Sequence, residues 1–166
     1  MFIEQIFTSP GHNYFGHHGK PPDDFPFFET KEIECLAGHG IRGDRFFDYR
    51  DNYKGQITFF AREVFDELSR AFGLTNQSPA LLRRNIIVSG VELNELIGTD
   101  FALQGVGFRG AAHCKPCYWM NSAVAPGAEE FLADRGGLRA LILTDGRIRV
   151  GDAQLEILHP AGLEIP

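Results

Sequence analysis

A mainly β fold is predicted for this chain of 166 residues, and three observations predict it. Short apolar runs recur along the sequence, each close to the usual strand length of about five or six residues. Several runs are followed by a Gly or Asp turn signal, and 19 glycines and 9 prolines are spread through the chain. Only two or three segments have the apolar periodicity of a helix.

The expected strands are short and run through the whole chain. They cover residues 2–6, 31–36, 56–60, 85–89, 101–103, 105–110, 140–143, 147–150 and 154–158. The clearest hairpin is expected in 141-LILTDGRIRVGD-152, where Asp145 and Gly146 would supply the positive-φ pair of a two-residue turn. Because closure removes exposed strand edges, we expect a closed or nearly closed β-barrel with peripheral short helices.

Two helices are expected on the outside of the sheet. The better one covers residues 61–72, and Gly73 would end it as a C-terminal cap. Its apolar side chains recur at helical spacing: Val64, Phe65, Leu68 and Phe72. The second covers residues 128–134, between two Gly-containing turns. Residues 9–26, SPGHNYFGHHGKPPDDFP, are too rich in Gly and Pro for a strand or a helix.

Composition argues against several classes of function. The formal net charge is −6, so the chain lacks the basic excess with which proteins bind the nucleic-acid backbone. No apolar run approaches the roughly 18 residues of a membrane span, and the N-terminus has no signal-peptide pattern. We therefore expect a single cytoplasmic domain over residues 1–166 that binds neither nucleic acid nor a membrane.

The chain contains three cysteines, Cys35, Cys114 and Cys117. In the cytoplasm, an odd number favours reduced thiols over a disulfide framework. Cys35 lies between apolar neighbours in IECLAG and is expected to be a small buried residue. The other two have the C-x-x-C spacing in 113-HCKPCYWMN-121. That spacing permits a zinc half-site, a dithiol redox pair or a nucleophilic thiolate.

The zinc and redox alternatives have less support in the sequence. Structural zinc needs four ligands, and the further candidates are Cys35 and scattered histidines such as His12, His17 and His18. A redox pair should open a helix, whereas YWMNSAVAPG after the second cysteine has no pattern for a long one. A further alternative is that both cysteines of the pair are inert core residues at a strand end.

A nucleophilic thiolate fits the surroundings of the pair better. Pro116 stiffens the turn between the two cysteines, and a stiff turn can present a thiol. Cations near a thiol stabilise the thiolate, which is the reactive form. Arg109, His113 and Lys115 are the cations that precede the second cysteine closely. The sequence therefore predicts a reactive thiol if the turn is exposed.

Two arginine clusters could bind an anion. In 40-GIRGDRFFDYR-50, two glycines allow turns that would direct Arg42 and Arg45, with Asp44 between them, at a ligand. In 83-RRNIIVSG-90, Arg83 and Arg84 enter a strand. Adjacent strand residues point to opposite faces, so at most one of this pair is expected to face a given pocket. Both clusters are also compatible with ordinary surface ion pairs.

The motifs occur in an order that points to a family. The order is GIRGDR, GQITFF leading into a helix, RRNIIVSGVELNELIG, a Pro-Cys pair after a strand, and GGLRALILTDGRIRVGD. It resembles the MOSC domain, named after the C-terminal domain of molybdenum cofactor sulfurases, over nearly the whole chain. The resemblance implies a β-barrel-rich fold that carries sulfur, or holds the molybdenum cofactor, through one cysteine. Cys117 corresponds to that cysteine, whereas Cys114 has a counterpart only in some members.

The same resemblance implies a pocket with basic and polar walls. Arg45, Arg83, Arg84 and Asn85 fall at the positions where family members surround that pocket. The pyridoxal-phosphate desulfurase domain of the cofactor sulfurases has no counterpart in this sequence. Nor does the additional domain of the molybdenum-dependent reductases.

The leading hypothesis for the function is a sulfur carrier. Cys117 would attack the persulfide of a donor such as a cysteine desulfurase, hold the outer sulfur and release it to a metal centre or the molybdenum cofactor. Cys114 would share the sulfur or displace it by forming a disulfide. Arg42, Arg45 and Arg83 would hold an anionic acceptor. Two alternatives stay open: Cys117 as the molybdenum ligand of a cofactor-binding enzyme, and a binding module without catalysis.

Overall fold

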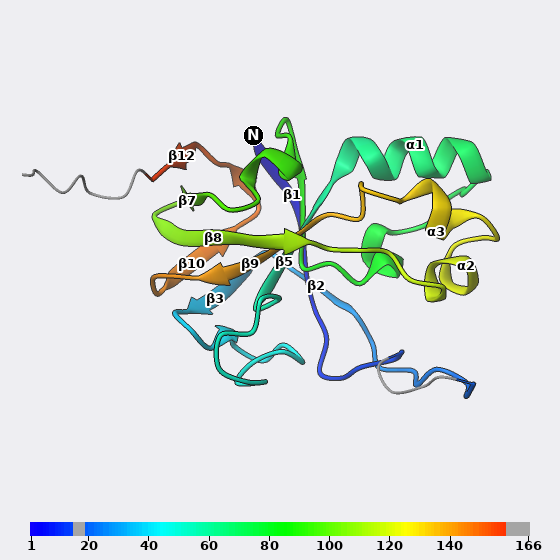
Figure 1. Ribbon diagram of the computed structural model, residues 1–166, viewed down its shortest axis with the longest axis horizontal. Helices are drawn as coiled ribbons and strands as arrows, with labels where there is room; N and C mark the ends of the chain where they lie inside the picture. Colours follow the sequence, from blue (N-terminus) through cyan, green and yellow to red (C-terminus); the bar gives the residue numbers. More distant parts are fainter. Residues whose placement is uncertain (15–18, 159–166) are drawn as a thin grey trace, which may run out of the picture.

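The computed structural model describes residues 1–14 and 19–158 and confirms the mainly β class (Figure 1). The strands are β1 (Phe2–Thr8), β2 (Phe28–Thr30), β3 (Glu32–Leu36), β4 (Gly40–Ile41), β5 (Ile57–Ala61), β6 (Ile86–Ser89), β7 (Asp100–Leu103), β8 (Val106–His113), β9 (Leu138–Ile142), β10 (Gly146–Arg149), β11 (Gly151–Asp152) and β12 (Leu155–Ile157). The helices are α1 (Arg62–Phe72), α2 (Trp119–Ala123), α3 (Ala128–Phe131) and the short 3₁₀ helices η1 (Pro79–Leu82) and η2 (Leu93–Leu96).

The strands form two sheets. The larger has nine strands in the order β11-β1-β6-β5-β9-β8-β7-β12, with β2 paired to β1, and the smaller has the order β10-β3-β4. β11 and β12 stand at opposite ends of the larger order, although only Ala153 and Gln154 separate them in the chain. So short a connection spans at most about 11 Å, which keeps the two edges close. No ladder joins them within the described residues, so a closed barrel is not confirmed.

All nine expected strands are present, but the expected hairpin around Asp145 and Gly146 is wrong. β9 pairs with β5 and β8, whereas β10 pairs with β3, so the chain crosses here from one sheet to the other. Asp145 accepts a hydrogen bond from the Ala37 N–H at 2.8 Å, which fixes the crossing. A Cβ on Gly146 would lie 2.6 Å from Val106, so glycine serves close packing and not a positive φ.

The centre of the larger sheet is buried on both faces. β5 and β6 run parallel, and α1 lies in the connection between them, as a parallel pair requires. Neighbouring side chains of β5 therefore enter two different cores. Phe59 packs between the sheets, with Ile33 and Ile148 of the smaller one, and Phe60 packs beneath the helices. This two-sided burial explains the uninterrupted apolar run of β5.

The helices α1, α2 and α3 gather on one side of the molecule, beyond the ends of the strands (Figure 1), whereas η2 packs against β5, β8 and β9. α1 agrees with the expected helix over residues 61–72, and Gly73 caps it with a φ of 62°. α3 is shorter than the expected helix over 128–134, and α2 was not expected. None of the helices in the described ranges has the length and apolar character needed to cross a bilayer.

Candidate functional site

A cavity of about 160 Å³ lies where the end of β8 meets the segment after β1 and the loop between β4 and β5. Its basic lining consists of four arginines, Arg45, Arg83, Arg84 and Arg139, and the imidazole of His12 also borders it. Its aromatic lining consists of Tyr14, Phe46, Tyr53 and Trp119. Cys114 and Cys117 also line it, and the described lining includes no Asp or Glu. The wall is therefore basic in a chain whose overall charge is negative.

The two thiols differ in exposure. They belong to the thiol turn, which we define as residues 113–117. Cys114 is buried, with 4% of its surface exposed, and its N–H donates to the Gly137 carbonyl at 2.7 Å. Cys117 is exposed, and its carbonyl accepts from the Met120 N–H at 2.8 Å at the start of α2. The cavity thus has one thiol that solvent reaches and one that the protein covers.

Gly136 anchors the thiol turn. A Cβ at this position would lie 2.2 Å from the Cys114 carbonyl oxygen and 3.1 Å from Pro116, so only glycine allows this approach. The Gly136 N–H donates to His113 Nε2 at 3.2 Å, and the Gly136 carbonyl accepts from Arg84 Nε at 3.0 Å. His113 therefore acts as a positioning residue, because a ring nitrogen that accepts a hydrogen bond carries no proton.

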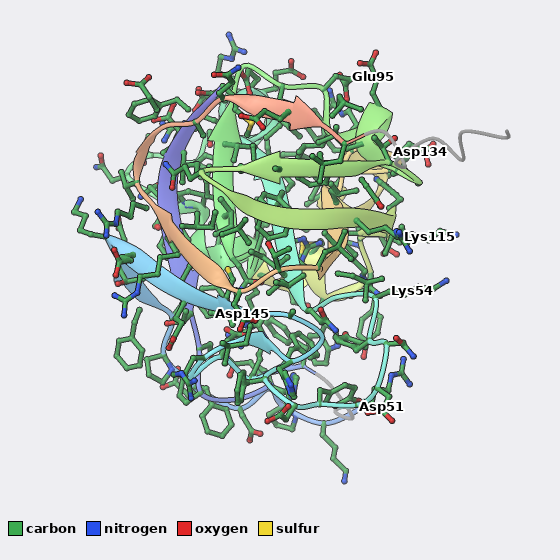
Figure 2. The ribbon with its side chains drawn as sticks, turned by 90° about the vertical axis from the view of Figure 1, so that its left-hand side faces the viewer. Asp51, Lys54, Glu95, Lys115, Asp134 and Asp145 are labelled. Carbon is green, nitrogen blue, oxygen red and sulfur yellow. The ribbon has the colours of Figure 1, made fainter. Side chains whose placement is uncertain are left out.

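Besides His113, three expected site cations do not line the cavity. Lys115 is exposed, and Figure 2 shows its side chain pointing away from the body of the molecule. Arg109 donates to both carboxylate oxygens of Asp100, at 2.6 and 2.7 Å. Arg42 donates to Glu34 at 2.5 Å. Each of these side chains is directed outward, although each lies close in sequence to a residue of the site.

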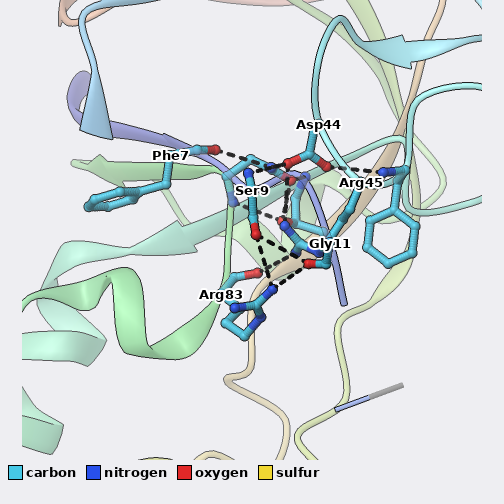
Figure 3. A network of polar contacts seen from close by, with 9 residues as sticks. Phe7, Ser9, Gly11, Asp44, Arg45 and Arg83 are labelled. Atoms are coloured by element: carbon cyan, nitrogen blue, oxygen red, sulfur yellow. Dashed lines mark hydrogen bonds and ion pairs between the residues drawn. The ribbon is translucent and has the colours of Figure 1, made fainter. Parts of the chain in front are cut away.

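Asp44 is the centre of a buried polar network (Figure 3). Its Oδ1 accepts hydrogen bonds from the Ser9 N–H at 3.1 Å and from the Asn85 amide at 3.3 Å. The Arg45 guanidinium donates to the same oxygen at 3.3 Å, and the Phe46 N–H donates to Oδ2 at 3.3 Å. Because both of its carboxylate oxygens accept hydrogen bonds, Asp44 stabilises the wall from behind, and its side chain does not line the cavity.

Asn85 is fully buried and joins three segments of the chain. Its amide donates to the Phe7 carbonyl at 3.2 Å as well as to Asp44. Its Oδ1 accepts from the Thr58 N–H at 3.1 Å and from the Thr58 hydroxyl at 2.8 Å. The same hydroxyl accepts from the Asn85 N–H at 3.0 Å. Asn85 therefore ties β1 and β5 to the start of β6, and it does not line the cavity.

Arg45 and Arg83 are held by aromatic rings as well as by hydrogen bonds. Their guanidinium groups lie 4.9 Å and 4.5 Å from the ring centre of Phe27. Arg45 donates to the Arg83 carbonyl at 3.0 Å, and Arg83 donates to the Gly11 carbonyl at 2.8 Å. Burial, followed by the charge of Arg45, lowers the pKa of Arg83 to about 10. Two positive charges thus lie close together on this wall, and a bound anion would offset their repulsion.

The expectation that only one of the adjacent arginines faces the pocket is wrong. Arg83 and Arg84 both line the cavity. Arg83 follows η1 in the left-handed conformation, with a φ of 55°, so strand alternation does not apply to it. Arg84 donates to the carbonyls of Leu82 and Gly136, at 2.8 and 3.0 Å. β6 begins only at Ile86.

Arg139 and Tyr53 were not expected in the site. Arg139 lies on β9, one residue before the expected start of that strand, and it lines the cavity together with Cys114. Burial alone would lower the pKa of the Arg139 guanidinium, but the attraction of Cys114, reinforced by Tyr53 and Cys117, outweighs it. The net effect is a raised pKa. Tyr53 fits against Gly55, where a Cβ would lie 3.1 Å from the ring. The alternating pattern of 138-LRALI-142 was the signal that could have placed Arg139 outside the core.

The aromatic residues form two pairs on the cavity wall. The rings of Tyr14 and Trp119 are 4.7 Å apart and those of Phe46 and Tyr53 are 4.9 Å apart. His12 packs edge-on against Phe46 at 4.7 Å. Burial, followed by the charges of Arg45 and Arg83, lowers the pKa of His12 and so favours its neutral form. The site therefore combines guanidinium groups with ring surfaces, which suits an anionic group joined to a planar ring.

Two predictions remain, a buried Cys35 and the alternative of a zinc site. Cys35 is fully buried between the sheets, and burial raises the pKa of its thiol to about 12, which confirms it as an inert core residue. Residues 1–14 and 19–158 contain no cluster of three or more His, Cys, Asp or Glu arranged to hold a metal ion. His17 and His18 lie outside the described residues.

A family model for the MOSC domain matches residues 16–154. The chain belongs to the MOSC domain family. The resemblance of its motifs to that family is therefore confirmed, and the match includes both arginine clusters and the thiol turn. No curated protein matches this MOSC domain in a sequence search.

Solved structures share the fold of this MOSC domain. The YuaD protein from Bacillus subtilis aligns with a TM-score of 0.73 and 18% identity, over 94% of each chain. YiiM from Escherichia coli aligns with a TM-score of 0.65 and 17% identity, over 97% of this chain and 71% of that one. YiiM from Geobacillus stearothermophilus aligns with a TM-score of 0.67 and 12% identity, over 95% and 75%. At these identities the likeness is one of fold.

Proposed function

We propose that this MOSC domain is a sulfur carrier: Cys117 takes up a sulfur atom as a persulfide and delivers it to an anionic acceptor bound in the cavity. One observation carries the proposal. An exposed thiol lies on the wall of a cavity that four arginines line, with no carboxylate in its described lining. A thiol on such a wall can receive sulfur from outside and meet a negatively charged acceptor inside.

Sulfur uptake requires no reagent besides the donor. The Cys117 thiolate attacks the outer sulfur of a donor persulfide, such as that on a cysteine desulfurase, and a new S–S bond forms. The S–S bond of the donor breaks at the same time, and the donor leaves as a thiolate. Delivery reverses the pattern, because the acceptor takes the outer sulfur and Cys117 leaves as a thiolate. Lys115, exposed beside the thiol, lies on the surface that a donor protein would approach.

The acceptor is expected to have an anionic head group. Ligand pockets usually measure about 300–1,000 Å³, so a cavity of about 160 Å³ would hold one end of a cofactor and not the whole of it. A phosphate suits the arginine wall, and a pterin ring suits the pair of Tyr14 and Trp119. The phosphorylated pterin of the molybdenum cofactor has both groups, and its known link to the family supports this choice.

A second candidate is a resident molybdenum cofactor with Cys117 as the metal ligand. The same residues fit it, because a thiolate is a soft donor and the arginines would hold the phosphate. The metal would supply redox chemistry when bound. This candidate differs from the first in a direct measurement, since protein from a cofactor-producing host should then contain one molybdenum per chain and Cys117→Ser should contain none.

Intact-mass measurement after incubation with a persulfide donor tests the carrier function. Reduced wild-type protein should gain one sulfur atom, and Cys117→Ser should gain almost none. Cys114→Ser is the matched control, because it removes the thiol that a donor protein cannot reach and should still gain sulfur. If Cys117→Ser takes up as much sulfur as the wild type, the carrier function is wrong. If neither cysteine is needed for binding a pterin phosphate, the domain is a binding module without catalysis.

A further inference from the structure

Arg139 differs from the other arginines of the cavity in what it binds. Arg45 donates to Asp44, Arg83 donates to the Gly11 carbonyl, and Arg84 donates to two backbone carbonyls. Among residues 1–14 and 19–158, no oxygen atom accepts a hydrogen bond from the Arg139 guanidinium. Arg139 lines the cavity together with the buried thiol of Cys114, whose negative charge would raise the pKa of the guanidinium.

The pairing of β8 with β9 explains this arrangement. Arg139 lies directly opposite Ala112 in the ladder. Cys114 is two residues further along, so it lies on the same face as Ala112 and diagonal to Arg139. The Cys114 N–H donates to the Gly137 carbonyl at 2.7 Å, which continues the ladder beyond the last residue of β8. A long side chain spans the diagonal distance of about 7–8 Å between such positions.

The two thiols have complementary positions. Cys117 is exposed and can meet a donor protein, whereas Cys114 has only 4% of its surface exposed and cannot. Both line the same cavity, and only two residues separate them. An outer sulfur held on the exposed thiol is open to water-borne thiols and other nucleophiles, whereas one held on the covered thiol is shielded from them.

We propose that sulfur is relayed inward from Cys117 to Cys114 and that Arg139 holds the sulfur-bearing anion at the buried position. The relay rests on the proposed carrier function and adds a second station to it. The Cys114 thiolate attacks the outer sulfur of the Cys117 persulfide and forms the new S–S bond. The old S–S bond breaks, and Cys117 leaves as a thiolate. No net oxidation occurs, so no other reactant is needed, and the guanidinium balances the negative charge inside.

Cyanide removes the outer sulfur of a persulfide as thiocyanate. The rate of this reaction reports how well the protein shields that sulfur from solvent. Wild type and Cys114→Ser are loaded with sulfur, freed of donor and treated with cyanide. The wild type should lose its sulfur several-fold more slowly than Cys114→Ser, whose sulfur stays on the exposed thiol. Arg139→Gln should lose sulfur as fast as Cys114→Ser, and Arg139→Lys should restore slow loss because it keeps the charge.

The matched control is Arg109→Gln, which removes one arginine from the adjacent strand outside the cavity and should behave as wild type. Equal rates in wild type and Cys114→Ser would overturn the relay while leaving the carrier function intact. Uptake by none of the proteins would overturn both.

A measurement on the wild type alone covers the case in which a variant does not fold. Trypsin releases residues 110–135 as one peptide, because Lys115 is followed by proline. Fragmentation of the alkylated peptide locates the extra sulfur. We expect it on Cys114, and extra sulfur found on Cys117 alone would overturn the relay.

Discussion

Two walls of one cavity use arginines in opposite ways. The closed wall consists of two lining arginines, Arg45 and Arg83, and of the residues behind them, Ser9, Asp44 and Asn85. Their polar groups bond to one another and to nearby carbonyls (Figure 3). The open wall consists of Cys114, Cys117, Trp119 and Arg139. The comparison teaches that an arginine expected to bind a ligand can be structural, whereas one that was not expected in the site, Arg139, can be available to a ligand.

Burial explains why the closed wall is bonded so completely. A buried polar group without a partner costs about 1–3 kcal/mol, and a buried charge costs more. Asp44, Asn85 and Ser9 are all buried, so each must satisfy its own groups. The open wall borders the cavity, where Cys117 reaches solvent and Arg139 faces a thiol. Its groups are thus available to a sulfur donor and an anion.

The largest expected effect is on the closed wall. Asn85→Ala should lower the free energy of unfolding by about 3 kcal/mol, because it leaves groups of Phe7, Thr58 and Asp44 buried without partners. Urea denaturation measures this. Asn94→Ala is the matched control, since Asn94 is exposed and donates to one carbonyl, that of Asp134. A loss no larger than that of the control would show that the closed wall is not structural.

The second-largest effect is expected at Gly136, beside the thiol turn. Gly136→Ala should cost about 1–3 kcal/mol, because the new Cβ would collide with the Cys114 carbonyl. It should also slow sulfur uptake, since the turn must shift. Gly107→Ala on β8 is the control, where a Cβ would lie 3.4 Å from Thr144 in ordinary contact. Unchanged stability together with unchanged uptake would contradict the anchoring role of Gly136.

On the open wall, the expected effect is on binding and not on stability. Trp119 is the only tryptophan of the chain and lines the cavity, so its fluorescence should report the binding of inorganic phosphate or a pterin phosphate. Arg139→Gln should weaken binding about tenfold, as expected for a lost hydrogen bond to a charged group. Arg109→Gln should leave binding unchanged. Equal weakening in both variants would mean that the anion responds only to net charge.

The smallest effect is expected outside both walls, at the exposed pair of Asp100 and Arg109. The hydrogen bond from Arg109 lowers the pKa of Asp100, so the unfolded chain binds more protons in acid. The pair therefore stabilises the fold above the usual pKa of Asp, and this contribution is lost as pH falls through the lowered pKa. Urea denaturation should show wild type slightly more stable than Arg109→Gln at neutral pH, and this difference should shrink as pH falls below the usual pKa of Asp. A difference that grows in acid would contradict this sign.

Local patterns gave correct predictions for elements whose signals lie within a few residues. α1 has both its apolar stripe and its capping glycine in the sequence, and its boundaries agree with the structure. The strands were found for the same reason. β2, β4 and β11 were missed because strands of two or three residues are too short to show alternation.

Pairing between distant segments could not be predicted in the same way. The turn signal at Asp145 and Gly146 does not correspond to a hairpin, because β9 and β10 pair with strands of different sheets. Strand alternation does not apply to Arg83, because it follows a 3₁₀ helix and its backbone has the left-handed conformation. Arg139 was missed because the expected strand began one residue too late.

The sequence by itself determined the β class, the main helix, the family and the presence of a thiol pair beside basic motifs. These features depend on local periodicity and on residues adjacent in the chain. Only the tertiary structure decided which cations meet the thiols. Arg109, His113 and Lys115 are near them in sequence but point elsewhere or bind other groups, whereas Arg139 reaches Cys114 across the β8–β9 ladder. The physical reason is that strand pairing, and not sequence distance, sets which side chains share a face.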